Sequence, residues 1–398
     1  MSGDAQVASP ERAAAAAAIL RNPDLLYESL HKRGPVQWSE QGRVWLVVGY
    51  QAARSVLRDV RFRMPGPGAD PEWGEGGAHG EFMRSLLLEA EGAHHERLRR
   101  ALGPVFSPRT VRAREERIRA VTDELLAEIK PDTTFDGVAT ISARLPVSVV
   151  GDLVGVPSRL RSEVSALCRA ISTGGGLASG AASADAVRSS IAALDELTML
   201  VRDWLKHPEL LPDGSVLATS AADPGTLTEA EIVANVFSLY LAGHDTSRNM
   251  LSALLFHLAG EESLLGDLAT GRTTPAAEVE RVLLGESPLT FTVRVALEEV
   301  RLEGELIAPG DRIRVMLGAA NHDLRRTGQS GGLLSGVSFG EGRHVCLGAH
   351  VARLEGIVVL ETVVRHWSTV ALADEPQWTP HFLHRGLNVL PLEVSWRS

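Results

Sequence analysis

The chain has 398 residues, with 40 lysines and arginines against 50 aspartates and glutamates, which gives a formal net charge of −10 at pH 7. This acidic balance argues against a general nucleic-acid-binding protein. Its 2 cysteines exclude a disulfide scaffold and a structural zinc site made of cysteines alone. No apolar run approaches the roughly 18–20 residues that cross a bilayer, and the N-terminus lacks the basic start of a secretory signal. We therefore expect a soluble, cytoplasmic protein that binds neither nucleic acid nor membranes.

Taken in chain order, the patterning predicts a mainly helical α+β protein with small β-sheets at its side. Alternating apolar residues predict a hairpin over residues 36–48, and a helix follows from about residue 51. The glycine- and proline-rich residues 65–80 are typical of a long loop. Further predictions are helices at 118–129, 146–153, 229–258 and 347–367, a flexible connector at 172–184, and strands at 291–295, 302–306, 312–317 and within 387–396. No repeat and no clear linker divides the chain, so we expect one domain over residues 1–398.

The most informative segment is the glycine-rich loop of residues 339–348, FGEGRHVCLG, which a helical pattern follows. A thiolate of Cys346 at a helix start would accept amide hydrogen bonds and be favoured by the positive end of the helix dipole. One cysteine makes a poor zinc site, but a haem iron needs only one protein thiolate. Taken alone, Cys346 is better explained as a small buried hydrophobe, the usual situation of a free cysteine. Only the full spacing favours a ligand.

That spacing resembles the haem-ligand signature of the cytochrome P450 family, Phe-Gly-x-Gly-x-His-x-Cys-x-Gly, at every fixed position. The resemblance covers nearly the whole chain, because residues 95–99, 145–157, 242–246 and 292–296 also look like family segments. It implies a helical prism around a buried haem b. It also implies a haem-thiolate monooxygenase that inserts oxygen from O2 into a small hydrophobic substrate in specialised metabolism. Electrons would come from a ferredoxin and its reductase.

The resemblance also assigns residues to the cofactor. Cys346 would be the axial thiolate, and Phe339, Gly340 and Gly348 would belong to the loop that shields and hydrogen-bonds its sulfur. Haem propionates are carboxylates and need cationic or donor partners. The matching positions are held by His95, Arg99, Arg294 and His344. Each of these could instead be a solvated surface group, but several segments converging on one anionic edge favour the cofactor.

A threonine and an acid in the long central helix suggest a proton path. The Thr246 hydroxyl can bond the Ala242 carbonyl four residues earlier and bend the helix, which can admit a water. Asp245 is an acid within an apolar helix, where a carboxylate is costly unless it has a partner. We expect Asp245 and Thr246 to relay protons toward dioxygen. The alternative is a bent helix with a satisfied polar pair.

The chain departs from the family at two linked places. The family carries Glu-x-x-Arg before the Ser-Pro at 287–288, but Arg281 and Leu284 hold those positions here. Another Glu-x-x-Arg, formed by Glu278 and Arg281, lies one turn earlier. If the helix gained a turn so that this second pair could serve, its apolar side chains would face another direction. We therefore expect the Glu-x-x-Arg pair to be lost. The stretch 321–339, which the pair anchors in the family, is also shorter than usual.

Two other functions therefore stay open. One keeps the haem but changes the chemistry to peroxide use or oxidative coupling. The other is a non-enzymatic partner protein that retains the fold. The retained Cys346, Asp245 and Thr246 argue against the partner role, whereas the lost Glu-x-x-Arg argues mildly for it.

Substrate and partner contacts are predicted only coarsely. A largely apolar lining would favour a hydrophobic substrate. The expected substrate contacts are residues 65–90, 172–184, 289–293 and 385–390, with positions near Phe237 and Leu241. A basic patch of Arg97, Arg100, Arg343 and Arg353 could receive an acidic electron-transfer partner. Scattered helix-face charge explains these arginines about equally well.

Overall fold

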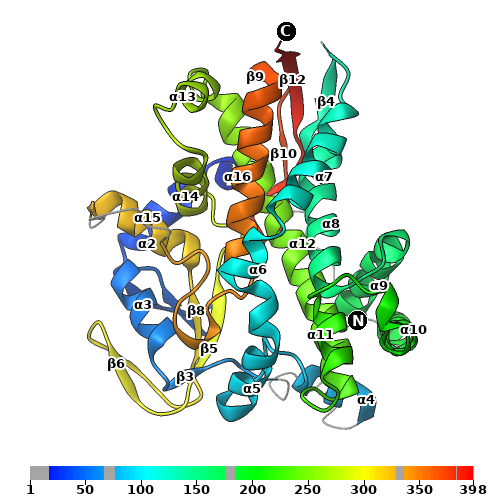
Figure 1. Ribbon diagram of the computed structural model, residues 1–398. Helices are drawn as coiled ribbons and strands as arrows, with labels where there is room; N and C mark the ends of the chain where they lie inside the picture. The colour runs from blue at the N-terminus through cyan, green and yellow to red at the C-terminus, as the bar shows by residue number, and fades with distance from the viewer. Residues whose placement is uncertain are drawn as a thin grey trace.

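The computed structural model describes residues 18–66, 77–131, 133–174, 184–328, 336–381 and 383–397. Helices make up most of these residues (Figure 1). They are α2 Asp24–His31, α3 Tyr50–Arg58, α4 Gly77–Arg84, α5 Gly92–Leu102, α6 Pro108–Arg112, α7 Glu115–Ala127, α8 Arg144–Val154, α9 Arg161–Gly174, α10 Ala184–Lys206, α11 Val216–Ala222, α12 Glu229–Gly260, α13 Leu264–Thr270, α14 Pro275–Gly285, α15 Leu317–Thr327 and α16 Ala349–His366.

The strands form small sheets beside the helices, as the sequence predicts. They are β1 Val36–Ser39, β2 Val44–Val47, β3 Phe62–Arg63, β4 Thr134–Asp136, β5 Thr292–Ala296, β6 Val300–Leu302, β7 Glu305–Ile307, β8 Arg312–Val315, β9 Trp367–Leu372, β10 Gln377–Trp378, β11 Leu387–Val389 and β12 Pro391–Trp396. A five-stranded sheet has the order β1-β2-β8-β5-β3, a three-stranded sheet has the order β4-β12-β9, and β6-β7 and β10-β11 are two-stranded. The mainly helical class with small sheets is confirmed.

Two predictions of local structure are wrong. The single strand expected at 302–306 is a hairpin, because Glu303 and Gly304 have φ values of 50° and 90° and reverse the chain between β6 and β7. The loop expected at 65–80 is shorter, because α4 begins at Gly77. Residues 67–76 of that loop and 175–183 of the expected connector lie outside the described residues.

Helix α12 is the central element of the helical part. The Thr228 hydroxyl accepts from the Glu231 amide at 3.2 Å, while the Glu231 carboxylate accepts from the Thr228 amide at 2.9 Å. This capping box satisfies two amides that a helix start leaves free. Most of the helix is buried, as its apolar composition predicts. Among the described residues, no helix has the length and apolar character that crossing a membrane requires.

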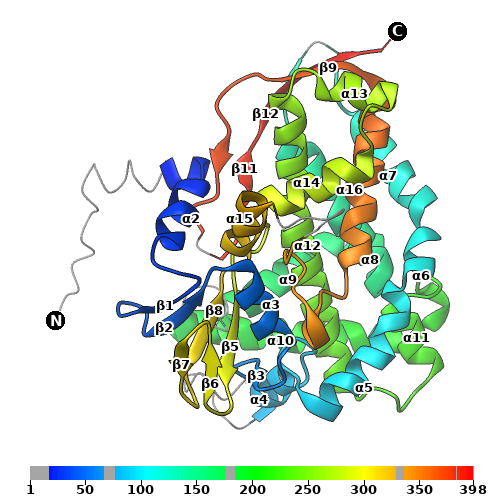
Figure 2. The same cartoon turned by 90° about the vertical axis from the view of Figure 1, so that its left-hand side faces the viewer.

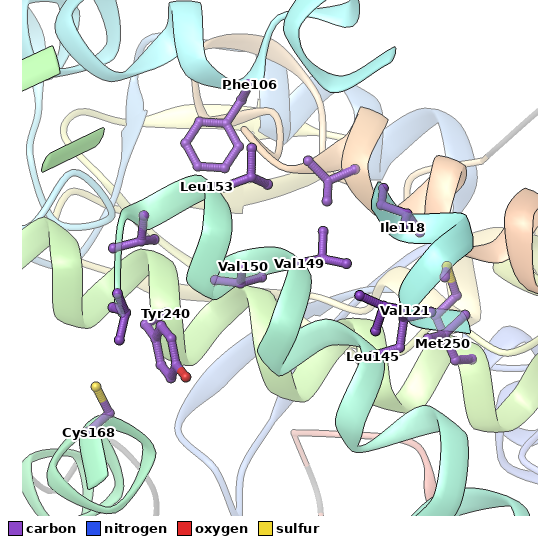
Figure 3. Packing of buried hydrophobic residues seen from close by; sticks show 14 of the residues in the cluster. Phe106, Ile118, Val121, Leu145, Val149, Val150, Leu153, Cys168, Tyr240 and Met250 are labelled. Atoms are coloured by element: carbon purple, nitrogen blue, oxygen red, sulfur yellow. The ribbon is translucent and has the colours of Figure 1, made fainter. Parts of the chain in front are cut away.

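Helix α8 packs closely along α12. Figure 3 shows Val149 and Val150 of α8 among side chains of α7 and α12. A Cβ on Gly243 of α12 would lie 2.7 Å from Cγ2 of Val150, so only glycine allows this approach. On its other sides α12 contacts α14 and α16, which lie beside it in Figure 2. The long helix is thereby fixed against the helix that follows Cys346.

Candidate haem-binding site

The loop before α16 is a tight turn that ends at Cys346. Gly340 and Gly342 have φ values of 67° and 72°, which glycine adopts without strain. A Cβ on Gly342 would overlap the Leu57 carbonyl oxygen, so the loop lies directly against α3. The Cys346 amide donates to the Phe339 carbonyl at 2.8 Å and closes the turn. The sequence therefore places its glycines where the backbone needs them.

Cys346 lies deep in the fold, yet its side chain is exposed. We infer from these two facts that the side chain borders a space inside the fold. Ala242, in the middle of the mostly buried α12, is exposed in the same way. Burial raises the pKa of the Cys346 thiol, while the Gly348 amide and the charges of Arg99 and Arg353 act to lower it. A metal or a positive group in that space would complete this environment for a thiolate.

Two arginines near this loop have no carboxylate partner among the described residues. Arg294 is 3% exposed, and its guanidinium donates only to neutral atoms: Sδ of Met64 at 2.9 Å, Oγ1 of Thr292 at 3.2 Å and the Val293 carbonyl at 2.8 Å. Burial lowers its pKa to about 10. Arg99 is half-buried and donates to the Val345 carbonyl at 2.6 Å. The charge of Glu91 acts on Arg294 from a distance, but a buried cation without a directly bonded carboxylate is costly, so the site suits an anionic ligand.

The two predicted histidines lie together beside these arginines. The rings of His95 and His344 are 4.4 Å apart between centroids, so α5 and the cysteine loop meet there. Burial, then the charges of His344 and Arg99, lower the pKa of His95 to about 4. His95 is therefore neutral near pH 7 and can offer a single N–H donor.

One acid in this group was not predicted. An oxygen of Glu91 lies 3.1 Å from Nε2 of His344 and accepts from the Met64 amide at 2.7 Å. Burial acts to raise the pKa of Glu91, but these hydrogen bonds and the charges of His344 and Arg343 lower it to about 2. The available signal was its position four residues before His95, which places both at one end of α5.

On α12 the predicted hydrogen bond is confirmed, since the Thr246 hydroxyl donates to the Ala242 carbonyl at 2.6 Å. Asp245 pairs with its neighbour His244 at 3.2 Å between Oδ1 and Nδ1. Burial acts to raise the pKa of Asp245, but His244 and the charges of His384 and Arg248 lower it overall. His244 and His384 were not predicted as parts of this group.

The comparisons with known proteins agree with this geometry, although no family model matches the chain. The biotin biosynthesis cytochrome P450 of Bacillus subtilis (strain 168) is 26% identical over 395 residues, covering 95% of this chain and 98% of that protein. The vitamin D(3) 25-hydroxylase of Pseudonocardia autotrophica is 29% identical over 397 residues, covering 95% of each chain.

Solved structures lead to the same family. CalO2 superposes with a TM-score of 0.85 at 27% identity, covering 95% of this chain and 97% of that one. P450BioI, in complex with an acyl carrier protein ligated to hexadec-9Z-enoic acid, gives a TM-score of 0.84 at 25% identity, covering 95% and 100%.

The chain belongs to the cytochrome P450 family. This P450 is a monooxygenase, an oxidoreductase, and its cofactor is haem b, iron protoporphyrin IX. The residues present fit that group. The sulfur of Cys346 borders an internal space, and two cations without carboxylate partners lie near its loop and suit the propionates.

Helix α14 carries the positions at which this P450 departs from the family's Glu-x-x-Arg pair. Glu278 is 1% exposed and accepts from the Thr273 hydroxyl at 2.6 Å, while His257 and Arg281 lie 3.2 and 3.3 Å away. The Arg281 side chain is 65% exposed. Among the described residues, neither Glu278 nor Arg281 bonds to residues 336–348. Leu284 packs in an apolar cluster instead.

The basic patch considered from the sequence is largely neutralised in this P450. Arg97 pairs with Glu231, and Arg353 pairs with Glu280 while covering the Phe339 ring at 4.4 Å. Arg343 donates to the carbonyls of Val60 and Phe62 at 3.0 and 3.1 Å. These bonds favour the alternative explanation, in which the arginines are scattered charges on helix faces.

The predicted substrate contacts are only partly placed. Residues 67–76 and 175–183 lie outside the described part of the chain. Phe237 is 2% exposed and packs against the Phe82 ring at 5.3 Å, so it belongs to the core. Leu241, one turn later on α12, is only partly buried.

Proposed function

We propose that this P450 inserts oxygen from O2 into a small hydrophobic organic substrate in specialised metabolism, with electrons from a ferredoxin and its reductase. The thiolate of Cys346 would hold the haem iron. The observation that carries the proposal is the Cys346 side chain, deep in the fold and exposed to an internal space. Two similar proteins support the substrate class, the vitamin D(3) 25-hydroxylase and a 6-deoxyerythronolide B hydroxylase.

The protein residues have separate tasks in this proposal. When bound, the haem supplies the oxygen chemistry, and thiolate ligation favours O–O cleavage. Phe339, Gly340 and Gly348 belong to the loop around the sulfur, and the Gly348 amide tunes it by a hydrogen bond. The propionate-binding residues are His95, Arg99, Arg294 and His344.

The proton path in this proposal runs along α12. Asp245 receives a proton from the His244 side, where the two groups are 3.2 Å apart. Asp245 passes this proton to the oxygen of the Thr246 hydroxyl, which the Ala242 carbonyl holds in place. The hydroxyl releases its own proton into the internal space, so both groups return to their starting protonation.

The carbon monoxide difference spectrum of the reduced protein tests the proposal. A thiolate-type band supports a haem-thiolate enzyme. A protein that stays free of haem after expression with excess haem precursor overturns it and favours the non-enzymatic partner role. Turnover supported by ferredoxin and reductase, compared with turnover supported by peroxide, then separates ordinary monooxygenation from peroxide use or oxidative coupling.

Thr246→Ala should uncouple electron use from product formation, because it removes the hydroxyl that passes the proton. We expect several-fold less product per electron pair, with the thiolate-type spectrum intact. Thr362→Ala is the matched control, since the Thr362 hydroxyl makes the same type of bond to Val358, at 2.7 Å, on α16. Unchanged coupling in Thr246→Ala would count against the relay.

Arg294→Gln should weaken haem retention, because it replaces a charge-assisted bond to a propionate by a neutral one. Transfer of haem to an excess of an acceptor protein should become roughly tenfold faster. Arg301→Gln serves as the control, because Arg301 lies exposed in β6. Equal transfer rates for both variants and the unmodified protein would contradict this role of Arg294.

A further inference from the structure

Residues 336–338, which lead into the cysteine loop, are bonded to two helices. The Ser338 hydroxyl donates to the Leu283 carbonyl of α14 at 2.6 Å. The Asn321 side-chain amide of α15 donates to the Ser338 oxygen at 2.6 Å, and its oxygen accepts from the Val337 amide at 2.8 Å. Asn321 and Ser338 are 0% and 9% exposed, so water does not compete for these bonds.

The bond to Leu283 uses a carbonyl that α14 leaves free. The helix ends at Gly285, so its last carbonyls have no partner within the helix. Ser338 satisfies one of them from outside. Helix α15 lies beside α14 in Figure 2, which brings Asn321 within reach of the same carbonyl, at 3.5 Å. One helix end thus receives two donors from separate segments.

The backbone at Gly336 is shaped for this contact. Its φ of +53° suits glycine, and a Cβ there would overlap the Asn321 side-chain oxygen. The same Cβ would lie 2.9 Å from Cδ1 of Leu284. Leu284 holds the position of the family arginine, so an apolar side chain now fills the space beneath this segment.

A short chain of bonds joins this contact to Cys346. The Gly340 amide donates to the Val337 carbonyl at 2.8 Å, and the Cys346 amide donates to the Phe339 carbonyl at 2.8 Å. Displacement of Val337 and Ser338 therefore moves the turn that carries the sulfur.

We propose that Asn321 and Ser338 are positioning residues that fix the Cys346 loop on α14, in place of the Glu-x-x-Arg pair that this P450 lacks. The inference rests on the proposed role of Cys346 as haem ligand. The proposed contact differs from an ion pair because it consists of hydrogen bonds from uncharged side chains to the Leu283 carbonyl of α14. The exposed Arg281 and the buried Glu278 take no part in it.

The test compares Asn321→Ala and Ser338→Ala with Ser338→Thr, which keeps the hydroxyl, and with Arg281→Ala. In each reduced holoprotein the thiolate-type carbon monoxide band is followed over time while circular dichroism follows the helices. We expect the two alanine variants to lose the band roughly tenfold faster at temperatures where the helix signal is unchanged. Ser338→Thr and Arg281→Ala should match the unmodified protein.

Three results separate the possibilities. An unchanged band lifetime in Ser338→Ala overturns the anchor, and so does a shortened lifetime in Arg281→Ala, which would make the shifted Glu-x-x-Arg the anchor. If Asn321→Ala does not fold, the comparison of Ser338→Ala with Ser338→Thr still decides. Absence of a thiolate-type band in the unmodified protein would instead overturn the proposed function.

Discussion

Cys346→Ser is expected to abolish both the thiolate-type carbon monoxide spectrum and substrate turnover. A serine hydroxyl is a weaker electron donor than a thiolate, so it cannot supply the donation that favours O–O cleavage. The expected loss is complete, and it is measured by the difference spectrum and by product formation with ferredoxin and reductase.

The chain contains one other cysteine, which provides the matched control. Cys168 of α9 is buried at 1% exposure in the apolar core, and burial raises the pKa of its thiol to about 12. A thiol in that environment stays protonated and is a poor ligand. Cys168→Ala should keep the spectrum and turnover and lose only packing energy. A thiolate-type band that survives in Cys346→Ser, or that disappears in Cys168→Ala, would contradict the assignment.

The parts of the site that could be predicted are those whose chemistry is local in the sequence. The Cys346 loop carries its own turn glycines, and the Thr246 bond reaches back only one helical turn. Glu91 and His384 were missed for the opposite reason. Each meets its partner through packing of distant segments, Glu91 with His344 and His384 with Asp245. No sequence pattern within one helix or loop predicts these two contacts between distant segments.

The same distinction holds for the fold. The start of the helix predicted at residue 229 is confirmed, and it is fixed by a short-range device, the capping box of Thr228 and Glu231. The turn between β6 and β7 was missed because Glu303 adopts a positive φ, which a side chain disfavours and only tertiary context imposes. Strand β9 was also missed, because its pairing with β12 supplies the hydrogen bonds that select a strand there.

Replacing Glu355 by Gln is expected to make the stability of the folded protein much less sensitive to a rise in pH from about 5 to about 8. Glu355 of α16 is 0% exposed, and the Ser247 hydroxyl lies beside it, but neither carboxyl oxygen has a well-formed hydrogen bond among the described residues. Burial raises its pKa to about 8, against a smaller lowering by the nearby Ser247 hydroxyl. The folded state therefore keeps this proton up to pH about 8, whereas the unfolded chain releases it near the ordinary glutamate pKa of 4.5.

The sign of the effect follows from proton binding. Between these two pKa values the folded state holds more protons than the unfolded state, so stability falls as pH rises. At about 1.36 kcal/mol for each pKa unit, this one carboxyl should cost roughly 3 to 4 kcal/mol between about pH 5 and pH 8. This loss of folding stability is absent below the pKa of the carboxyl in the unfolded chain and complete above its pKa in the folded protein.

Urea unfolding of the holoprotein at the two pH values measures this difference. Other groups that titrate in the same range contribute equally to both proteins, so the difference between Glu355→Gln and the unmodified protein isolates Glu355. Glu361→Gln is the control on the same helix, because Glu361 is 39% exposed and pairs with Arg119 at 2.6 Å. That variant should lose the same small amount at both pH values. If Glu355→Gln keeps the full loss of stability between about pH 5 and pH 8, the carboxyl is already ionised in the folded protein over that range. It must then have a partner, such as an internal water, that carries its charge.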